Sequence, residues 1–318
     1  MKRFILVALV VLATLMAAGC AERLDDVTFD DDDTIVVEMR GESLKILQLT
    51  DMHLTYGIDH NDRATYRAIE TLVQADDYDL VVFTGDMVMS PLAPWLFSRL
   101  VRLMESLETP WTFVFGNHDA DYHSLATLIA RTEGSEYLLF RPGPELDDGG
   151  VGNFKITFTR EGTPFYHLYF LDSKAERDDY TEETGVYDYL SPAQVAWYEG
   201  HVADDSVPSI VFMHTPLRQF MLVEAHDYVG TFGEPVHPQG IDTGFFDAMV
   251  SHGKSVGVFV GHDHENDFHF ELEGIVLAYG RLTGYNAYGP RSIGGRVIVI
   301  DENAEMSTHI VLLDEVSP

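Results

Sequence analysis

Short apolar runs alternate along this chain with longer stretches in which apolar residues recur every three or four positions. The short runs have the length of buried strands, and the longer stretches have the periodicity of helices that bury one face. This alternation predicts an α/β fold, and the unbroken apolar strands predict sheets that are covered on both faces. The expected strands are 44–49, 80–83, 112–115, 154–158, 165–171, 209–213, 256–260, 296–300 and 306–313, and the expected helices are 61–75, 92–107, 124–131 and 192–200.

Composition is consistent with a globular protein rather than a disordered chain. The 318 residues include 46% hydrophobic and 12% aromatic residues, which is ample material for a packed core. We find no internal repeat, low-complexity segment or second linker, so we expect one domain over residues 35–318.

Acidic residues dominate the charged set. The chain has 52 Asp and Glu against 20 Lys and Arg, a formal net charge of −32. Such a surface repels polyanions, and no basic stripe offsets it, so nucleic-acid binding is a poor explanation of function. The simplest role of the acidity is solubility, and no protein partner is expected.

The N-terminus has the order of an export signal. Two basic residues precede an uncharged apolar run, 4–15, and small residues then lead to the only cysteine, Cys20. The run is short for a membrane span, and the small residues before the cysteine resemble a bacterial lipobox. We therefore expect a lipoprotein signal peptide over 1–19, lipid on Cys20, an acidic tether over 20–34, and an extracytoplasmic protein anchored to a bacterial membrane. The alternative is an ordinary signal peptide with a coincidental cysteine.

Side chains that bind metals follow five of the expected strands, each at the point where the strand ends. Because ligands of α/β sheets bind beyond the carboxyl ends of the strands, we expect these loops to share one edge. Glycine precedes the polar residue in three loops, where it lets the backbone pass close to a ligand. The segments are Asp51-Met52-His53, Gly85-Asp86, Gly116-Asn117-His118-Asp119, His214 and Gly261-His262-Asp263-His264.

The donor types indicate a metal centre. Carboxylate, imidazole and carboxamide groups without thiolate suit Mn, Fe or Zn and exclude an iron–sulfur cluster. One tetrahedral zinc ion cannot use so many donors, whereas a pair of ions ~3.5–4 Å apart can. Each motif alone is more often a turn, a cap or a buried polar residue. All five in order, each after a strand, predict two metal ions, whose identity the sequence leaves open between Mn, Fe and Zn.

Together these segments resemble the signature of the calcineurin-like metallophosphoesterase superfamily over about residues 44–265. The resemblance implies a four-layer α-β-β-α sandwich, in which two mixed sheets are flanked by helices. The segment 261–268 is similar to the branch named after purple acid phosphatase 29. True purple enzymes have Gly and Tyr where this chain has His53 and Met89, so a tyrosinate-to-iron colour is not expected.

The resemblance also implies a role for each motif residue. Asp86 would bridge the two ions, and His118, which lies beside a ligand, resembles the catalytic histidine of the family. Asp119 is a candidate orienting partner of His118, and Arg281 and Arg291 are candidate phosphate contacts because guanidinium pairs well with phosphate. The remaining expected ligands are Asp51, His53 and His264 for the first ion and Asn117, His214 and His262 for the second.

The implied reaction is hydrolysis of a phosphate ester. Water activated by the two ions would attack phosphorus, and His118 would protonate the leaving oxygen or hydrogen-bond a phosphate oxygen. Small phosphomonoesters are the expected substrates. A phosphodiesterase acting on nucleotides or lipid head groups is the alternative, because the same metal core serves both. An inactive binding module with the same fold is a third possibility, against which the complete set of ligand types argues.

Overall fold

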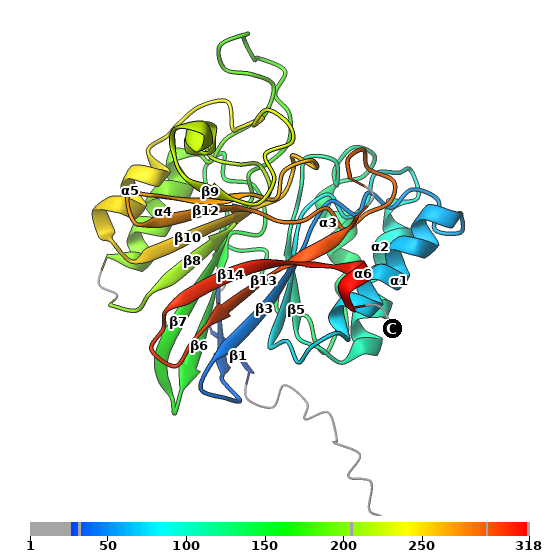
Figure 1. Cartoon of the computed structure of the whole chain (residues 1–318), viewed down its shortest axis with the longest axis horizontal. Coiled ribbons are helices and arrows are strands. Elements are labelled where there is room, and N and C mark those ends of the chain that lie inside the picture. The colour runs from blue at the N-terminus through cyan, green and yellow to red at the C-terminus, as the bar shows by residue number, and fades with distance from the viewer. Residues whose placement is uncertain (1–26, 31–32, 204–205, 291, 317–318) are drawn as a thin grey trace, which may run out of the picture.

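Two β-sheets lie face to face in the computed structural model (Figure 1), which describes residues 27–30, 33–203, 206–290 and 292–316. Within these residues the larger sheet has the order β1-β2-β6-β7-β8-β10-β12-β11-β9, in which the strands are Val27–Asp30, Thr34–Glu38, Phe154–Arg160, Thr163–Phe170, Ser209–Phe212, Ser255–Val260, Ile275–Tyr279, His269–Leu272 and Tyr228–Val229. The smaller sheet has the order β14-β13-β3-β4-β5, in which the strands are Met306–Leu312, Gly294–Ile300, Leu44–Leu49, Leu80–Thr84 and Trp111–Val114. Both sheets mix parallel and antiparallel pairs.

Helices cover the outer face of each sheet (Figure 1). Helices α4 (Pro192–Val202) and α5 (Phe245–His252) lie outside the larger sheet, and α1 (His60–Val73) and α2 (Ala93–Leu107) lie outside the smaller one. This arrangement confirms the predicted four-layer α-β-β-α fold. Among the described residues no helix is long and apolar enough to cross a membrane. The shorter helices are α3 Leu125–Ile129, η1 Ala130–Thr132, η2 Arg218–Ala225 and α6 Leu313–Val316.

Every strand and helix expected from the apolar pattern corresponds to an element of the structure. The elements that the pattern missed are short or lie at sheet edges, and β11 and β12 are the most informative of them. These two strands form a hairpin whose turn residues, Glu273 and Gly274, both have a left-handed backbone, with φ of 51° and 79°. Two consecutive residues of positive φ are typical of a tight hairpin, and the apolar run of β12 was a second signal in the sequence.

Residues 27–30, which form β1, belong to the larger sheet. Strand β1 pairs antiparallel with β2, and β2 pairs parallel with β6. Between these strands the Asp33 carboxylate accepts a hydrogen bond of 2.8 Å from the indole N–H of Trp197 on α4. Residues 27–30 are therefore paired in the sheet and Asp33 is hydrogen-bonded to α4, which corrects the later part of the expected tether, 20–34. The expected signal peptide, 1–19, and Cys20 lie outside the described residues.

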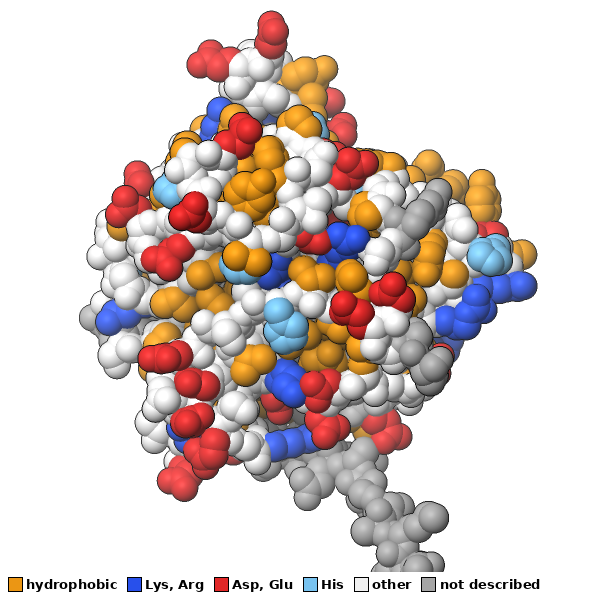
Figure 2. Space-filling view, in the orientation of Figure 1, with side chains coloured by type: hydrophobic (Ala, Val, Ile, Leu, Met, Phe, Trp, Pro, Cys, Tyr) orange, Lys and Arg blue, Asp and Glu red, His pale blue; other side chains and the backbone are white. Residues whose placement is uncertain are grey.

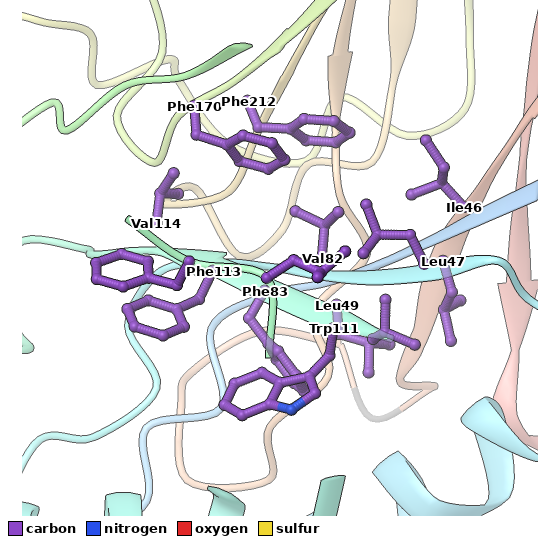
Figure 3. Packing of buried hydrophobic residues seen from close by; sticks show 14 of the residues in the cluster. Ile46, Leu47, Leu49, Val82, Phe83, Trp111, Phe113, Val114, Phe170 and Phe212 are labelled. Atoms are coloured by element: carbon purple, nitrogen blue, oxygen red, sulfur yellow. The ribbon is translucent and has the colours of Figure 1, made fainter. Parts of the chain in front are cut away.

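The inner faces of the two sheets share one apolar core (Figure 3). Phe170 and Phe212 of the larger sheet face Val82 and Val114 of the smaller sheet, and all four are buried. The two phenylalanine rings stack with centroids 5.3 Å apart. Burial of this surface is the main favourable contribution to folding, and it holds the carboxyl ends of both sheets at a fixed separation.

One buried arginine ties the sheets together. Arg296 lies on β13 of the smaller sheet and is fully buried. Its Nε donates to the carbonyl oxygen of Tyr279 on β12 (2.6 Å), and its Nη2 donates to that of Asp267 (2.6 Å). Burial lowers the pKa of Arg296 to about 10, so the guanidinium stays charged at neutral pH. A carbonyl group of β12 and one in the loop before β11 therefore depend on donors from the smaller sheet.

Replacement of this arginine tests the connection. Arg296→Met removes the donors and leaves two buried carbonyl oxygens unsatisfied, so the free energy of unfolding should fall by about 3 kcal/mol, measured by urea denaturation. The matched control is Arg67→Met on an exposed position of α1, which should change stability by less than about 0.5 kcal/mol. Equal stabilities of the two variants would show that the hydrogen bonds of Arg296 do not stabilise the contact between the sheets.

Candidate metal centre

The five polar loops meet where the carboxyl ends of the two sheets come together. Strands β3, β4 and β5 are parallel neighbours in the smaller sheet, and β8 and β10 are parallel neighbours in the larger one. The side-chain Nε2 of Gln48 on β3 donates to the carbonyl oxygen of Val260 on β10 (2.9 Å), across the two sheets. The expected shared edge is therefore real, but two sheets contribute to it rather than one.

Four candidate ligands have a left-handed backbone. The φ angles are 57° at Asp51, 44° at His53, 51° at Asp86 and 82° at His262. Residues with side chains rarely adopt this region, at a cost on the order of 1–3 kcal/mol each, and they do so mostly at functional sites. The turns bring Asp51 and His53, two residues apart, into one cluster.

Glycine is required where the backbone passes the carboxylates. A Cβ atom on Gly116 would lie 2.2 Å from Oδ1 of Asp86, and one on Gly261 would lie 2.9 Å from Oδ2 of Asp51. Both distances are shorter than real Cβ contacts, so any larger residue would displace a carboxylate. This confirms the expectation that these glycines permit a close approach.

The first half of the cluster is buried and contains four residues: Asp51, His53, Asp86 and His264, whose ligand atoms all lie within 4.8 Å of one another. The Nε2 atoms of His53 and His264 are 3.1 Å apart. Oδ2 of Asp86 lies 3.4 Å from Nε2 of His53, and Oδ1 of Asp51 lies 3.5 Å from Nε2 of His264.

The second half contains Asn117, His214 and His262, and it shares Asp86 with the first. Oδ1 of Asn117 lies 3.0 Å from Nε2 of His214 and 2.9 Å from Nδ1 of His262. These two imidazole nitrogens are 3.3 Å apart. Oδ2 of Asp86 lies 3.4 Å from Nε2 of His214, the same distance as from His53. Asp86 therefore stands between the two halves.

These distances fit metal ions. Atoms that bind one ion at about 2.0–2.2 Å lie about 3–3.5 Å from each other, as the converging atoms do here. The carbonyl oxygen of Thr84 lies 2.7 Å from Nδ1 of His214, and a hydrogen bond there directs the lone pair of Nε2 into the cluster. The cluster is therefore compatible with a binuclear metal site, and Asp86 lies between its two halves.

Burial and charge set the protonation of the cluster. Burial lowers the pKa of His53 and of His262 to about 4, so both imidazoles are neutral at pH 7. Burial acts in the same direction on His214, but the adjacent Asp86 carboxylate outweighs it and raises the pKa of His214 to about 10. The pKa of Asp86 stays well below its usual range, although burial opposes this, because His214 is charged. Without metal, a proton on His214 neutralises Asp86, and a bound ion would take its place.

His118 lies at the edge of the cluster rather than within it. Its backbone N–H donates to Oδ1 of Asp86 (2.9 Å), and its ring centroid is 5.5 Å from that of His53. The side chain is 34% exposed, and its Nδ1 lies 2.9 Å from Oδ2 of Asp121. Asp121, which the sequence analysis did not single out, is therefore the partner of His118.

Asp119 has a different role from the one expected. Its carboxylate accepts hydrogen bonds from the backbone N–H groups of Val88 (2.9 Å) and Gly116 (2.9 Å). It therefore joins the loops that follow β4 and β5. Burial, together with the charge of Asp86, raises the pKa of Asp119 to about 7.

Arg281, a candidate phosphate contact, makes its hydrogen bonds away from the cluster. Nη1 of Arg281 bonds the Asp267 carboxylate, and its Nε and Nη2 donate to the carbonyl oxygen of Ser292. The guanidinium is already engaged on both sides, which corrects its assignment as a phosphate contact. Arg291 lies outside the described residues.

A second layer of residues fixes the turn that carries His262 and His264. Oδ1 of Asp263 lies 2.6 Å from Nδ1 of His237, and its Oδ2 accepts a hydrogen bond of 2.6 Å from the Tyr279 hydroxyl. Such outer partners orient metal ligands. These outer partners were not predicted from the sequence. The available signal was Asp263, the carboxylate between the two histidines.

Comparison with known proteins agrees with the geometry. Residues 44–266 match the model of the calcineurin-like phosphoesterase family. The chain is 28% identical over 312 residues to the probable inactive purple acid phosphatase 14 of Arabidopsis thaliana, covering 83% of this chain and 76% of that one. It is 29% identical over 265 residues to the phosphatase DCR2 of Saccharomyces cerevisiae, covering 70% and 44%. A dimetal phosphatase from Danio rerio shares the fold, with a TM-score of 0.55 and 11% identity over 83% of this chain and 98% of that one.

The fold and the family define a metal-dependent phosphoesterase. The family model spans both halves of the cluster, from β3 to the turn after β10. The chain therefore belongs to the calcineurin-like phosphoesterase family, and its relatives include a purple-acid-phosphatase-like protein.

The close approach at Gly116 gives a test of the cluster that does not depend on any substrate. Gly116→Ala should displace Asp86 and reduce bound metal from about two ions per chain to one or none, measured by elemental analysis after dialysis. Gly200→Ala in α4, where a Cβ atom meets nothing within 4 Å, is the matched control and should retain all the metal. Full metal content in Gly116→Ala would argue against the cluster as the binding site.

Proposed function

We propose that this protein is an exported, lipid-anchored phosphatase that hydrolyses small phosphomonoesters with two metal ions. The observation that carries the proposal is the position of Asp86, whose Oδ2 lies 3.4 Å from a histidine of each half of the cluster. A carboxylate shared in this way would hold two ions, which would together supply positive charge to one phosphate. The identity of the ions, Mn, Fe or Zn, is part of what the experiment below determines.

The mechanism assigns separate tasks to the cluster and to its edge. One ion would be held by Asp51, His53 and His264. The other ion would be held by Asn117, His214 and His262, and Asp86 would bind both ions. When bound, the ions supply positive charge that stabilises the phosphoryl group and lower the pKa of the attacking water. His118 would then protonate the leaving oxygen or hydrogen-bond a phosphate oxygen. Because Asp121 engages Nδ1 of His118, Nε2 is the nitrogen that remains for this task.

Hydrolysis of phosphodiesters is the alternative, because the same ions and the same acid serve either ester. The acidity of the molecule favours small substrates over polyanions in both cases. Acidic side chains are spread over the face shown in Figure 2, with fewer basic ones among them. A binding protein without activity is the third candidate, and the name of the plant relative is in line with it. Competent residues at all seven ligand positions and at His118 favour activity here.

Two substitutions separate metal binding from catalysis. In a protein loaded with Mn, Fe or Zn, Asp86→Ala should lose both metal and turnover of p-nitrophenyl phosphate. His118→Ala should keep about two ions per chain and lose roughly 10²-fold or more in kcat. Turnover of bis-p-nitrophenyl phosphate alone would establish the diesterase alternative. Metal loss in His118→Ala would make it a ligand, and absence of turnover with either ester would favour a binding role.

Lipid anchoring is the part of the proposal that rests on residues 1–20 alone. The apolar run and the small residues before Cys20 support it. Expressed in a bacterial host, the unchanged protein should sediment with membranes, and Cys20→Ser should shift to the soluble exported fraction. Membrane association of both forms would show that the cysteine is not the anchor.

A further inference from the structure

Solvent reaches the cluster along the turn that follows β10. His262 and His264 are the most exposed of the candidate ligands, at 7% and 6%, whereas Asp51, Asp86 and His214 are at 1% or less. These two imidazoles therefore lie on the side of the cluster along which the organic group of a bound phosphoester can extend outward. The side chains around them determine what kind of ester fits.

Two tyrosines border this opening, one on each half of the cluster. The Tyr187 ring packs edge-on against His262, with centroids 4.2 Å apart and an interplanar angle of 90°. The Tyr288 ring packs against His264, with centroids 4.3 Å apart and an angle of 37°. Neither tyrosine belongs to the five strand-end segments. Tyr187 is half-buried, and Tyr288 is 56% exposed.

The structure holds both aromatic rings in place although they are partly in solvent. The Tyr288 hydroxyl donates to Oε2 of Glu234 (3.0 Å), and Oε1 of Glu234 accepts the backbone N–H of Glu265 (2.8 Å). The carbonyl oxygen of Tyr187 accepts the N–H of Gly240 (3.2 Å). The part of each ring that remains in solvent gains nothing from core packing, which points to a ligand as its contact.

The charges at the opening limit the type of ligand. The groups that hold its borders are carboxylates, Glu234 at Tyr288 and Asp121 at His118. They disfavour further phosphates on the substrate, whereas the faces of tyrosine rings attract flat π-systems. The contacts therefore suit an ester with a single phosphate and an aromatic or heterocyclic group.

We propose that Tyr187 and Tyr288 are specificity-determining residues that select phosphoesters whose organic group carries a flat aromatic or heterocyclic ring. This inference rests on the proposed phosphoesterase function and adds the substrate class to it. The rings act on binding of the organic group, while the cluster and His118 act on phosphorus.

A pair of matched esters tests the inference with the metal-loaded full-length chain. 2-Phenylethyl phosphate and 2-cyclohexylethyl phosphate have similar leaving alcohols and similar size, but only the first has a flat ring. The unchanged protein should prefer the first by about threefold to tenfold in kcat/KM, the size expected for one aromatic contact. Tyr288→Leu and Tyr187→Leu should each bring the ratio towards one, and Tyr288→Phe should preserve it.

The control is Tyr180→Leu, a tyrosine of similar exposure, 53%, for which no ring contact with the cluster occurs among the described residues; it should leave the ratio unchanged. Hydrolysis of both esters at equal kcat/KM by the unchanged protein would overturn the inference and leave the proposed function standing. Loss of metal in both leucine variants would show that the rings only support the imidazoles, which also overturns it. Hydrolysis of neither ester, nor of p-nitrophenyl phosphate, would overturn the proposed function and the inference together.

Discussion

The convergence of seven donor side chains on one small buried volume is the constraint on which the rest of this structure depends. Carboxylate oxygens and imidazole lone pairs at about 3 Å from one another are unfavourable in a protein interior unless positive charge lies between them. Without metal, a proton on His214 beside Asp86 supplies part of that charge. Two metal ions would supply it more completely, and the spacing of the donor atoms matches that role.

The scaffold around the cluster consists of features that oppose this unfavourable arrangement. Apolar packing between two sheets fixes the distance between the strand ends, and Arg296 and Gln48 connect the sheets by hydrogen bonds. Left-handed backbone at four candidate ligands and glycine beside the carboxylates are tolerated because this scaffold enforces them. The packing of the sheets therefore supplies the folding free energy that offsets the strained backbone of the loops at the cluster.

The residues around the opening are not part of the donor set of the cluster. The donor set lies within the residues that match the family model, and relatives of this chain carry both active and inactive names. Tyr187, Tyr288 and the carboxylates at the opening lie outside the five strand-end segments. With the role that we propose for these residues, the cluster would perform the chemistry and the residues around the opening would select the substrate.

The sequence alone determined the layered α/β fold, the main strands and helices, and the cluster residues, because apolar periodicity and short motifs are local properties. It could not assign partners across the chain. Asp119 and Asp121 are two residues apart, and only the folded loop shows that Asp121 contacts His118 while Asp119 joins two loops. Arg281 looks like a phosphate ligand in sequence, yet the fold pairs it with Asp267. Tertiary structure decided these roles because side-chain contacts depend on where distant segments meet, and a linear pattern does not encode those distances.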